Sequence, residues 1–288
     1  MIPDSILDCI PSARPYGRLI AGALLMLLLL APTHAADPPD KGADSKAADS
    51  KGGGDGLTPD RPGFTNGSDT VTPGHVQIEA GVTRTKGASP FAKMSAGGDG
   101  LTTDAPQALV RTGLNDKMEL RLTLPDYAWP SGSASGFSDG TVGLRYKFYQ
   151  SKDGNTKLAF TPSLSLPVRS AVTSSGHVDP VLSLNGQTTS GARWSLSSNL
   201  ILSYPTQNGG RVTDYTATGQ VTYALSAQTS VFGDYYYDAP VGAPPSPIAD
   251  GGFTYRVAKN VQLDIETGRG LGGAAPVQFY GGGVALRF

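Results

Sequence analysis

The sequence predicts an all-β protein: a transmembrane up-and-down antiparallel β-barrel of about 12 strands, closed by its C-terminal strand. Three observations predict it. The chain ends on an alternating segment, residues 277–288. Tight turns alternate with longer loops rich in Gly, Pro and Ser between the strand-like segments. An N-terminal leader indicates export, so we expect the barrel to lie in the bacterial outer membrane.

The terminal segment, Val277 to Phe288, reads VQFYGGGVALRF. Leu286 and Phe288 fall on one face and Arg287 on the other, a period of two that is typical of a strand wetted on one side. A strand that ends the polypeptide leaves an open edge, and closing the sheet on itself removes that edge. Phe288 is similar to the last residue of outer-membrane barrels. That similarity implies an interaction with the outer-membrane barrel insertion machinery.

The same alternation predicts the other strands. It is clearest in residues 118–124, where Leu120 and Leu122 oppose Glu119 and Arg121. In 105–114 and 178–186 it is too weak to assign faces. An even strand number places both termini on the periplasmic side. The segments are residues 74–86, 105–114, 118–124, 137–149, 157–168, 178–186, 194–204, 211–225, 229–238, 248–258, 261–268 and 277–288.

The composition excludes several classes of function. The chain has 288 residues and a formal net charge of -1, which gives no electrostatic case for binding nucleic acid. Its one cysteine, Cys9, lies in the leader, so the exported chain has neither a disulfide nor a Cys-ligated metal site. Arg14 and Arg18 precede the apolar run 19–31, and residues 1–35 are therefore predicted to be a signal peptide. The alternative, a membrane anchor, needs about 20 apolar residues.

Between the leader and the barrel lie two different segments. Residues 36–56 are a low-complexity tether, expected to be disordered because they have no large apolar residue. Residues 57–73 are rich in Pro and Gly, and are expected to be a periplasmic lead-in or a partial plug, ahead of the barrel at 74–288. We expect Arg61 to pair with a lumen carboxylate such as Glu79 and to set the width of the pore. The plug candidates are Asp60, Arg61 and Phe64.

The charged positions of the strands identify the face that we expect to line the lumen. Burying so many charges in a soluble core would cost several kcal/mol each unless they were paired, whereas a wet lumen tolerates them. Aromatic residues near strand ends, such as Trp194 and Tyr280, suit two interfacial girdles. A soluble sandwich with these charges in solvent is the alternative. The lumen-lining candidates are Glu79, Glu119, Arg121, Arg145, Asp214, Asp234, Asp250, Arg256, Asp264 and Glu266.

Several motifs resemble one family of bacterial outer-membrane proteins, labelled "putative meta-pathway of phenol degradation" and often simply "transporter". The resemblance covers roughly residues 57 to 288. It implies a barrel fold and transport connected with the catabolism of aromatic or hydrophobic compounds. The motifs are DRPGFT at 60–65, VTPG at 71–74, QIEAG at 77–81, SDGTVGLRYK at 138–147, Leu166-Pro167, and GGFTYRVAKNVQLDIETGR at 251–269.

No motif predicts catalysis, cofactor binding or metal binding. Residues 268–273 satisfy G-x-G-x-x-G, but a last strand follows them where dinucleotide binding requires a helix. After export only His75 and His177 remain, too few for a zinc site. A membrane-embedded hydrolase would have to pair His177 with Ser174 or Ser175, and no elbow motif supports it. We therefore expect no catalytic residue, no cofactor and no metal.

The hypothesis that follows is a channel for passive uptake of small solutes, aromatic or hydrophobic ones included, through a narrow polar lumen. Its partners would be outer-membrane lipid and the solute. The alternative is a structural or adhesive barrel with a plugged lumen and outer loops that bind a ligand. The sequence leaves the solute, the direction of transport and the oligomeric state open.

Overall fold

A computed structural model describes residues 56–87, 89–90, 100–168, 174–207 and 209–288. The predictions of a signal peptide at 1–35 and of a tether at 36–56 lie outside the described residues, apart from Gly56. The described residues all belong to one compact unit, Ser45–Phe288. Within this part of the chain, no helix is long and apolar enough to cross a membrane.

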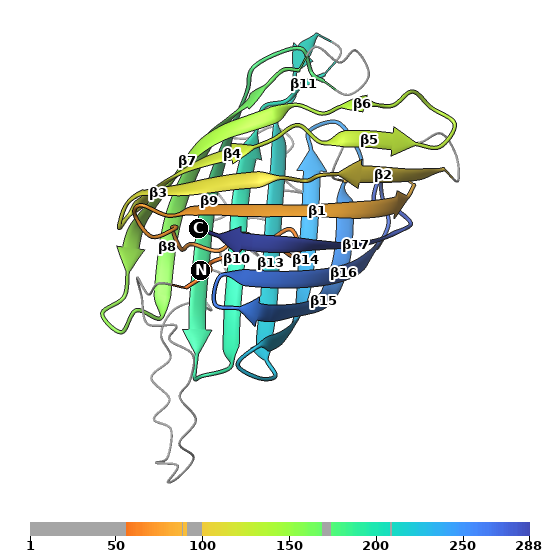
Figure 1. The fold of residues 1–288 in the computed structure, drawn as a ribbon. Coiled ribbons are helices and arrows are strands. Elements are labelled where there is room, and N and C mark those ends of the chain that lie inside the picture. The colour runs from red at the N-terminus through yellow and green to blue at the C-terminus, as the bar shows by residue number, and fades with distance from the viewer. Residues whose placement is uncertain (1–55, 88, 91–99, 169–173, 208) are drawn as a thin grey trace, which may run out of the picture. The chain divides into compact units, whose positions relative to one another are not determined.

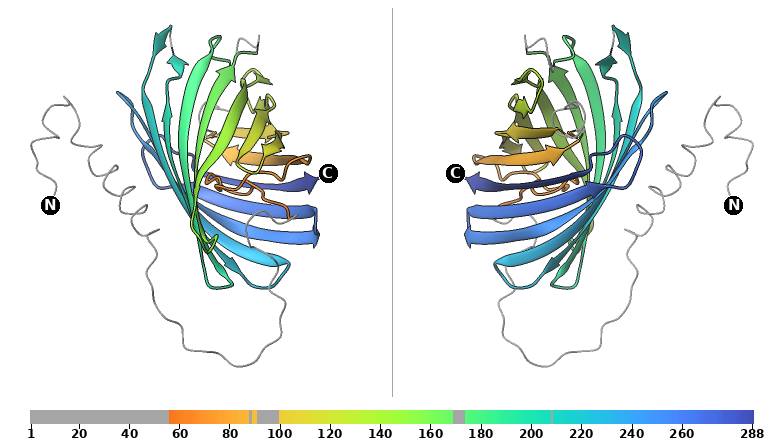
Figure 2. Two further views of the ribbon diagram at one scale, coloured as in Figure 1. Left: turned by 90° about the vertical axis from the view of Figure 1, so that its left-hand side faces the viewer. Right: turned by 90° about the vertical axis from the view of Figure 1, so that its right-hand side faces the viewer.

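The described residues form a closed antiparallel barrel (Figures 1 and 2). The strand elements are β1 (Val76–Lys86), β2 (Leu101–Ala105), β3 (Leu109–Asn115), β4 (Met118–Thr123), β5 (Tyr127–Pro130), β6 (Gly136–Phe137), β7 (Gly140–Gln150), β8 (Thr156–Leu166), β9 (Asp179–Ser190), β10 (Trp194–Ser203), β11 (Thr206–Gln207), β12 (Gly210–Arg211), β13 (Asp214–Ala224), β14 (Thr229–Pro240), β15 (Ser246–Ala258), β16 (Val261–Gly270) and β17 (Gln278–Arg287).

Closure occurs between the first and last strands, as predicted. β17 pairs antiparallel with β1, from Gln77 opposite Arg287 to Lys86 opposite Gln278. β2 with β3, β4 with β5 and β6 with β7 each make one interrupted barrel strand. The described sheet of 15 elements is therefore a barrel of 12 strands. β11 and β12 form a separate hairpin.

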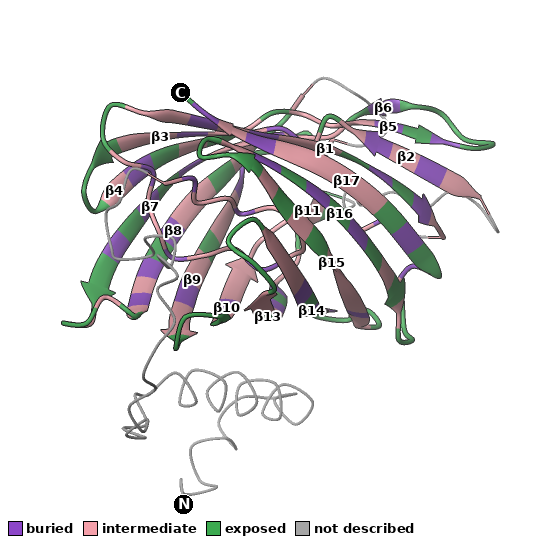
Figure 3. Ribbon diagram, turned by 60° about the horizontal axis from the view of Figure 1, so that its bottom comes forward, coloured by how far each residue is buried: buried purple, intermediate pink, exposed green. Residues whose placement is uncertain are grey.

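The two faces of the barrel wall have opposite chemistry. On β4, Leu120 and Leu122 are 38% and 41% exposed, whereas Glu119, the residue before Leu120, is fully buried. Arg111 and Arg145 are the largest of the fully buried side chains in the described chain. Figure 3 shows the alternation as bands of buried and exposed residues along the strands. Apolar residues outside and charges inside are the reverse of a soluble core, and they confirm the barrel over the sandwich.

Several strands differ from their predicted bounds. The segment predicted at 105–114 is β2 and β3, separated by residues 106–108. The strand predicted at 178–186 continues to Ser190. Gln187 and Thr189 line the interior of the barrel, so their polarity does not mark the end of a strand. A period-two pattern is hard to recognise where the outward residues are also polar, as Thr188 and Ser190 are.

The tight turns lie together at one end of the barrel, which we call the turn end. They connect β3 to β4, β7 to β8, β9 to β10, β13 to β14 and β15 to β16. β1 begins and β17 ends there, because Val76 pairs with Thr112 and Gln77 with Arg287. Gly154 and Gly191 have φ of 76° and 59° in two of these turns, a conformation that glycine adopts without strain. The longer connections lie at the opposite end, as predicted.

Candidate functional site: a segment enclosed by the barrel

Residues 57–73, which we call the inner segment, lie inside the barrel. In Figure 1 the segment is the orange coil enclosed by the strands, and Figure 3 shows it from the turn end. Leu57, Thr65 and Val71 are buried within it. Its conformation is irregular, so its backbone N–H groups need partners other than a helix or a sheet ladder.

Carboxylates of the barrel wall accept those N–H groups. Glu79 Oε2 accepts the N–H of Asp60 and of Arg61, both at 2.8 Å. Asp234 Oδ2 accepts the N–H of Phe64 at 2.8 Å and of Thr65 at 2.9 Å. Hydrogen bonds from N–H to a carboxylate are about twice as strong as neutral ones. Acidic residues predicted to line the lumen therefore bind the inner segment directly.

Two more carboxylates extend this pattern along the segment. Glu266 Oε2 accepts the N–H of Gly63 at 2.8 Å. Glu119 Oε2 accepts the N–H of Val71 at 2.7 Å. The carboxylates that bind the segment come from β1, β4, β14 and β16, so the segment is held from several sides of the barrel.

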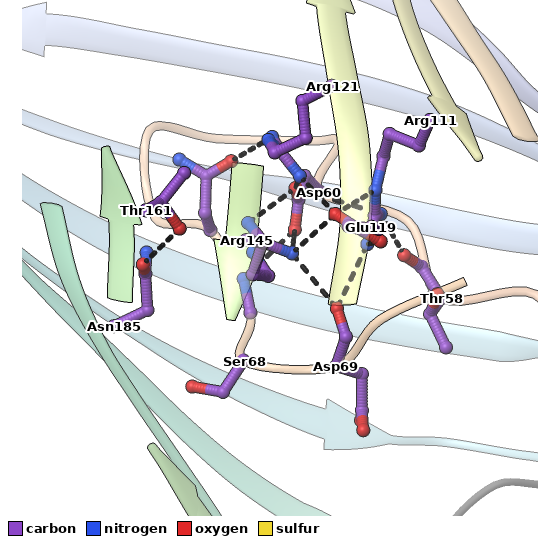
Figure 4. Close-up of polar contacts among 12 residues, drawn as sticks. Thr58, Asp60, Ser68, Asp69, Arg111, Glu119, Arg121, Arg145, Thr161 and Asn185 are labelled. Carbon is purple, nitrogen blue, oxygen red and sulfur yellow. Dashed lines mark hydrogen bonds and ion pairs between the residues drawn. The ribbon is translucent and has the colours of Figure 1, made fainter. Parts of the chain in front are cut away.

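A buried cluster of charges surrounds Asp60 (Figure 4). Its Oδ2 lies 2.6 Å from Arg121 Nη1, 2.8 Å from Arg145 Nη2 and 3.6 Å from Arg111 Nη1. Burial alone raises the pKa of Asp60, but the three guanidinium groups lower it more and hold it well below the ordinary value. Glu119 completes the cluster, 2.9 Å from Arg111 Nε and 2.8 Å from Arg121 Nη1. With Glu79, whose Oε1 lies 3.0 Å from Arg111 Nη1, the cluster holds three cations and three anions and is internally compensated.

Arg111 connects the cluster to the backbone of the inner segment. Its Nη1 donates to the carbonyl oxygen of Thr58 and, at 3.0 Å, to Glu79 Oε1. Its Nη2 donates to the carbonyl oxygen of Asp69 at 3.0 Å, and Arg145 Nη1 donates to the same oxygen at 3.0 Å. The arginines therefore bind the carbonyl groups of the segment, while the carboxylates bind its N–H groups.

Arg61 makes contacts different from those expected. Its Nη2 lies 3.2 Å from Asp264 Oδ1 and 3.8 Å from Glu266 Oε1. Glu79, the expected partner of its side chain, instead accepts its backbone N–H. The reason is spatial: the guanidinium extends along the wall toward β16, because neighbouring glycines leave room for it. Cβ atoms built on Gly81 and Gly283 would both clash with this side chain.

Phe64 anchors the segment by apolar contact. Its ring centroid lies 4.6 Å from that of Tyr236 and 5.8 Å from that of Phe279. Phe279 and Tyr236 point inward, and Phe279 is only 1% exposed. Inward aromatic residues are therefore packed against the segment, in contrast to Tyr280, which is 55% exposed on the outer face.

The remainder of the segment is held by neutral amides and one lysine. Asn199 exchanges two hydrogen bonds with the backbone of Asn66, at 2.7 Å and 2.9 Å. Gln187 Oε1 accepts the N–H of Ser68 at 3.0 Å. Both oxygens of Asp69 accept Lys157 Nζ at 2.8 Å. These contacts come from β8, β9 and β10, on the wall opposite β1.

The structure places the predicted residues in three groups. Seven of the lumen-lining candidates gather around the inner segment: Glu79, Glu119, Arg121, Arg145, Asp234, Asp264 and Glu266. Asp250 lies opposite Asp234, and neither of its carboxylate oxygens has a hydrogen-bond partner in the described chain. Asp214 starts β13 at the far end of the barrel, and Arg256 lines a cavity at the turn end. Asp60, Arg61 and Phe64 all contact the wall.

Sequence reasoning missed Arg111, which is fully buried and contacts both the segment and Glu119. It lies where the alternation is too weak to assign faces. One signal was available: Arg111 is the only charged residue between 105 and 115, and a charge in a barrel strand points to the lumen. The amides Asn199 and Gln187 were also missed, because neutral polar residues occur on both faces.

A cavity of about 1330 Å³ lies between the inner segment and the wall at the turn end. On one side are residues of the segment, including Pro62 and Thr65. On the other side are mostly polar wall residues: Gln187, Ser195, Ser197, Gln220, Thr222, Thr254 and Gln262. The segment therefore narrows the interior without filling it.

The residues considered for catalysis do not form a site. Ser175 Oγ bonds the backbone oxygen and N–H of His177 rather than its imidazole. His75 is near the start of β1, far along the chain from that loop, and its Nδ1 contacts the oxygen of Pro73 at 3.3 Å. Gly268 and Gly270 end β16, and a loop leads from there to β17. Neither a nucleophile–base pair nor a helix for dinucleotide binding is present in this described part of the chain.

A closed antiparallel barrel with an apolar outer face and a charged interior defines a class, the β-barrel proteins of bacterial outer membranes. Within that class, the chain belongs to the family described as "Putative MetA-pathway of phenol degradation", whose model matches residues 59–288. No curated protein sequence matches the chain.

Solved structures of similar fold are outer-membrane channels. One is described as the COG4313 outer membrane channel from Pseudomonas putida F1, with 14% identity and a TM-score of 0.55 over 77% of this chain and 98% of that one. Another is the NanC porin, with 9% identity and a TM-score of 0.52 over 73% of this chain and 98% of that one. At these identities the likeness shows the fold.

Proposed function

We propose that this protein is an outer-membrane channel for the passive uptake of small solutes, and that the inner segment sets the width of its passage. The observation that carries the proposal is the cavity between the segment and the polar wall of β9, β10, β13 and β15. A barrel that served only as a structural element would not need to keep such a space.

The size of the barrel supports a narrow passage. Eight strands leave an interior that side chains fill, whereas 16 to 18 strands leave an open aqueous channel. The 12 strands of this barrel lie between these limits, and the inner segment occupies part of the interior. We therefore propose a small conductance and a passage for single small molecules rather than a general diffusion pore.

The segment is a fixed part of the passage in this proposal. Its backbone is bound by charged side chains from several strands, and Asp60 is bound by three buried arginines. Removing one partner of a buried ion pair costs about 3–5 kcal/mol. Spontaneous release of the whole segment is therefore rare, and solutes would pass beside it rather than through the space it occupies.

The description of the family names a pathway of phenol degradation. We extend this to the solute class of our proposal: small molecules, aromatic ones included, that enter from the side of the long loops and leave at the turn end. A structural or adhesive barrel is the second candidate, and the tight binding of the inner segment is the observation that favours it.

Conductance of the refolded chain in a planar bilayer distinguishes a channel from a structural or adhesive barrel. We expect small, stable steps for the chain starting at residue 36, and a several-fold larger step after deletion of residues 57–70. As a control, replacing residues 57–70 by a Gly/Ser segment of equal length keeps the chain length but removes the anchoring side chains. A chain that conducts only after the deletion would contradict the channel and support the sealed barrel.

A further inference from the structure

The charged residues that line the cavity are mainly basic. Arg61, Lys117, Lys147, Lys157, Arg193 and Arg256 line it, against Asp60, Asp69 and Asp116. The excess is notable because the whole chain is nearly neutral, with a formal net charge of -1. The cavity therefore concentrates positive charge at the turn end of the lumen.

The carboxylates in the cavity are compensated. Asp60 lies against three guanidinium groups. Both oxygens of Asp69 accept Lys157 Nζ at 2.8 Å, and Lys147 Nζ lies 4.0 Å from one of them. Asp116 is exposed in the turn between β3 and β4, at the rim of the cavity. No carboxylate inside the cavity is left with uncompensated charge.

Among the wall carboxylates outside the cavity, Asp264 and Glu266 offset the charge of Arg61 but not that of the other basic residues. Glu79, Asp234 and Glu266 are buried against the inner segment, whose N–H groups they accept. Asp264 has a side chain that is 0% exposed and pairs with Arg61. The inner segment thus covers the acidic wall, and the cavity beside it retains the basic side chains.

Some of these cations have no anionic partner. The guanidinium of Arg256 makes no hydrogen bond or ion pair with the described chain, although its residue is half-buried and lines the cavity. Arg193 Nη1 donates to the neutral hydroxyl of Tyr223 at 3.1 Å, which leaves its charge uncompensated. A guanidinium presents paired N–H donors that match the two oxygens of a carboxylate.

We propose that this cavity is an anion-selective vestibule and that its solutes are small organic carboxylates, with Arg256 as the group that contacts the carboxylate. The proposal rests on the channel function proposed above. Neutral donors such as Gln220 and Thr222 surround the vestibule, and Phe232 supplies one aromatic surface for the organic part of the solute. A low-dielectric cavity with an excess of one sign of charge raises the local concentration of the opposite ion.

Reversal potentials in a KCl gradient test the selectivity. We expect the wild-type chain to prefer chloride over potassium. Arg256→Gln should lower the anion-to-cation permeability ratio about two- to fivefold, the scale of one unit charge acting at contact distance through water. Lys259→Gln removes the same charge from an exposed turn that does not line the cavity, and should leave the ratio unchanged. Equal effects of the two substitutions would overturn the proposal.

A second experiment tests whether the vestibule binds organic carboxylates. Benzoate added on the turn-end side should block chloride current, and Arg256→Gln should raise the half-blocking concentration at least fivefold. Block by benzoate that is no stronger than by inorganic phosphate would overturn the carboxylate part. A chain that conducts without anion preference would overturn this inference but would still support the proposed channel function. A chain that conducts no ions removes the channel and the inference with it.

Discussion

Gly81 and Gly283 are directly paired across the β1–β17 seam, and the side chain of Arg61 lies against both. Any larger residue at either position would occupy the space of the guanidinium. The paired glycines allow Arg61 to pass along the wall and reach Asp264 on β16 at 3.2 Å. The strand pairing that closes the barrel therefore also provides the site for the inner segment.

The first prediction concerns the effect of replacing Gly81 on conductance. In Gly81→Ala the three atoms nearest the new Cβ all belong to the Arg61 guanidinium, so we expect the strand to stay intact and the guanidinium to move away from Asp264. We expect larger or noisier conductance steps, because the inner segment loses one anchor. Gly233→Ala is the matched control, since nothing lies within 4 Å of its new Cβ. Identical traces for both variants would show that Arg61 does not affect the width of the passage.

Asp60→Asn is expected to lower stability. The substitution removes the charge that faces Arg111, Arg121 and Arg145, and leaves buried guanidinium groups undercompensated. Breaking a buried pair in this way costs about 3–5 kcal/mol. Thermal unfolding in detergent measures the loss, with Asp116→Asn in an exposed turn as the control. A change in Tm no larger than that of the control would contradict a structural role of the cluster.

The same residue predicts a pH dependence. The pKa of Asp60 in the folded chain lies below its ordinary value of 3.8, so its stabilising contribution is complete above about pH 4. It is lost only as the pH falls from there toward the folded pKa. The stability difference between wild type and Asp60→Asn should be constant from pH 7 to about pH 5 and should shrink below pH 4. A difference that already shrinks between pH 7 and pH 5 would refute this.

The lipid-facing side of β4 gives a fourth prediction. Leu122→Lys places a charge on the apolar face and should cost up to about 2–4 kcal/mol near the bilayer midplane. Thr123→Lys, one residue along, points to the opposite face and should cost much less. Urea titrations of the chain folded in lipid vesicles measure both. The reverse order of stabilities would mean that the two faces are assigned incorrectly.

The period-two pattern was sufficient to predict the barrel, its closure and the faces of its clearest strands. β4 shows why: Glu119 and Leu120 differ so strongly in polarity that only one face can meet lipid. The pattern did not resolve residues 105–114, where Pro106 interrupts the strand and Arg111 is a single charge among small and polar residues. It also ended β9 too early, because lumen-facing residues resemble turn residues in polarity.

The contacts of the inner segment could be predicted only in outline. The sequence indicated that Asp60, Arg61 and Phe64 meet the barrel wall, but it could not assign their partners. Arg61 and Asp264 are separated by 203 positions in the chain, and the choice among several wall carboxylates depends on where glycines leave space. Backbone N–H groups have no sequence signature, so their binding by Glu79 and Asp234 was also beyond prediction.

The location of Arg61 has a consequence for biogenesis. Its surroundings combine Gly81 from the first strand with Gly283 and Asp264 from the last two, and this pocket does not exist while the ends of the sheet are still apart. An environment-sensitive probe attached at position 61 would therefore respond only once the cylinder is sealed. The signal of such a probe would therefore report when the final step of barrel insertion, the pairing of β1 with β17, is complete.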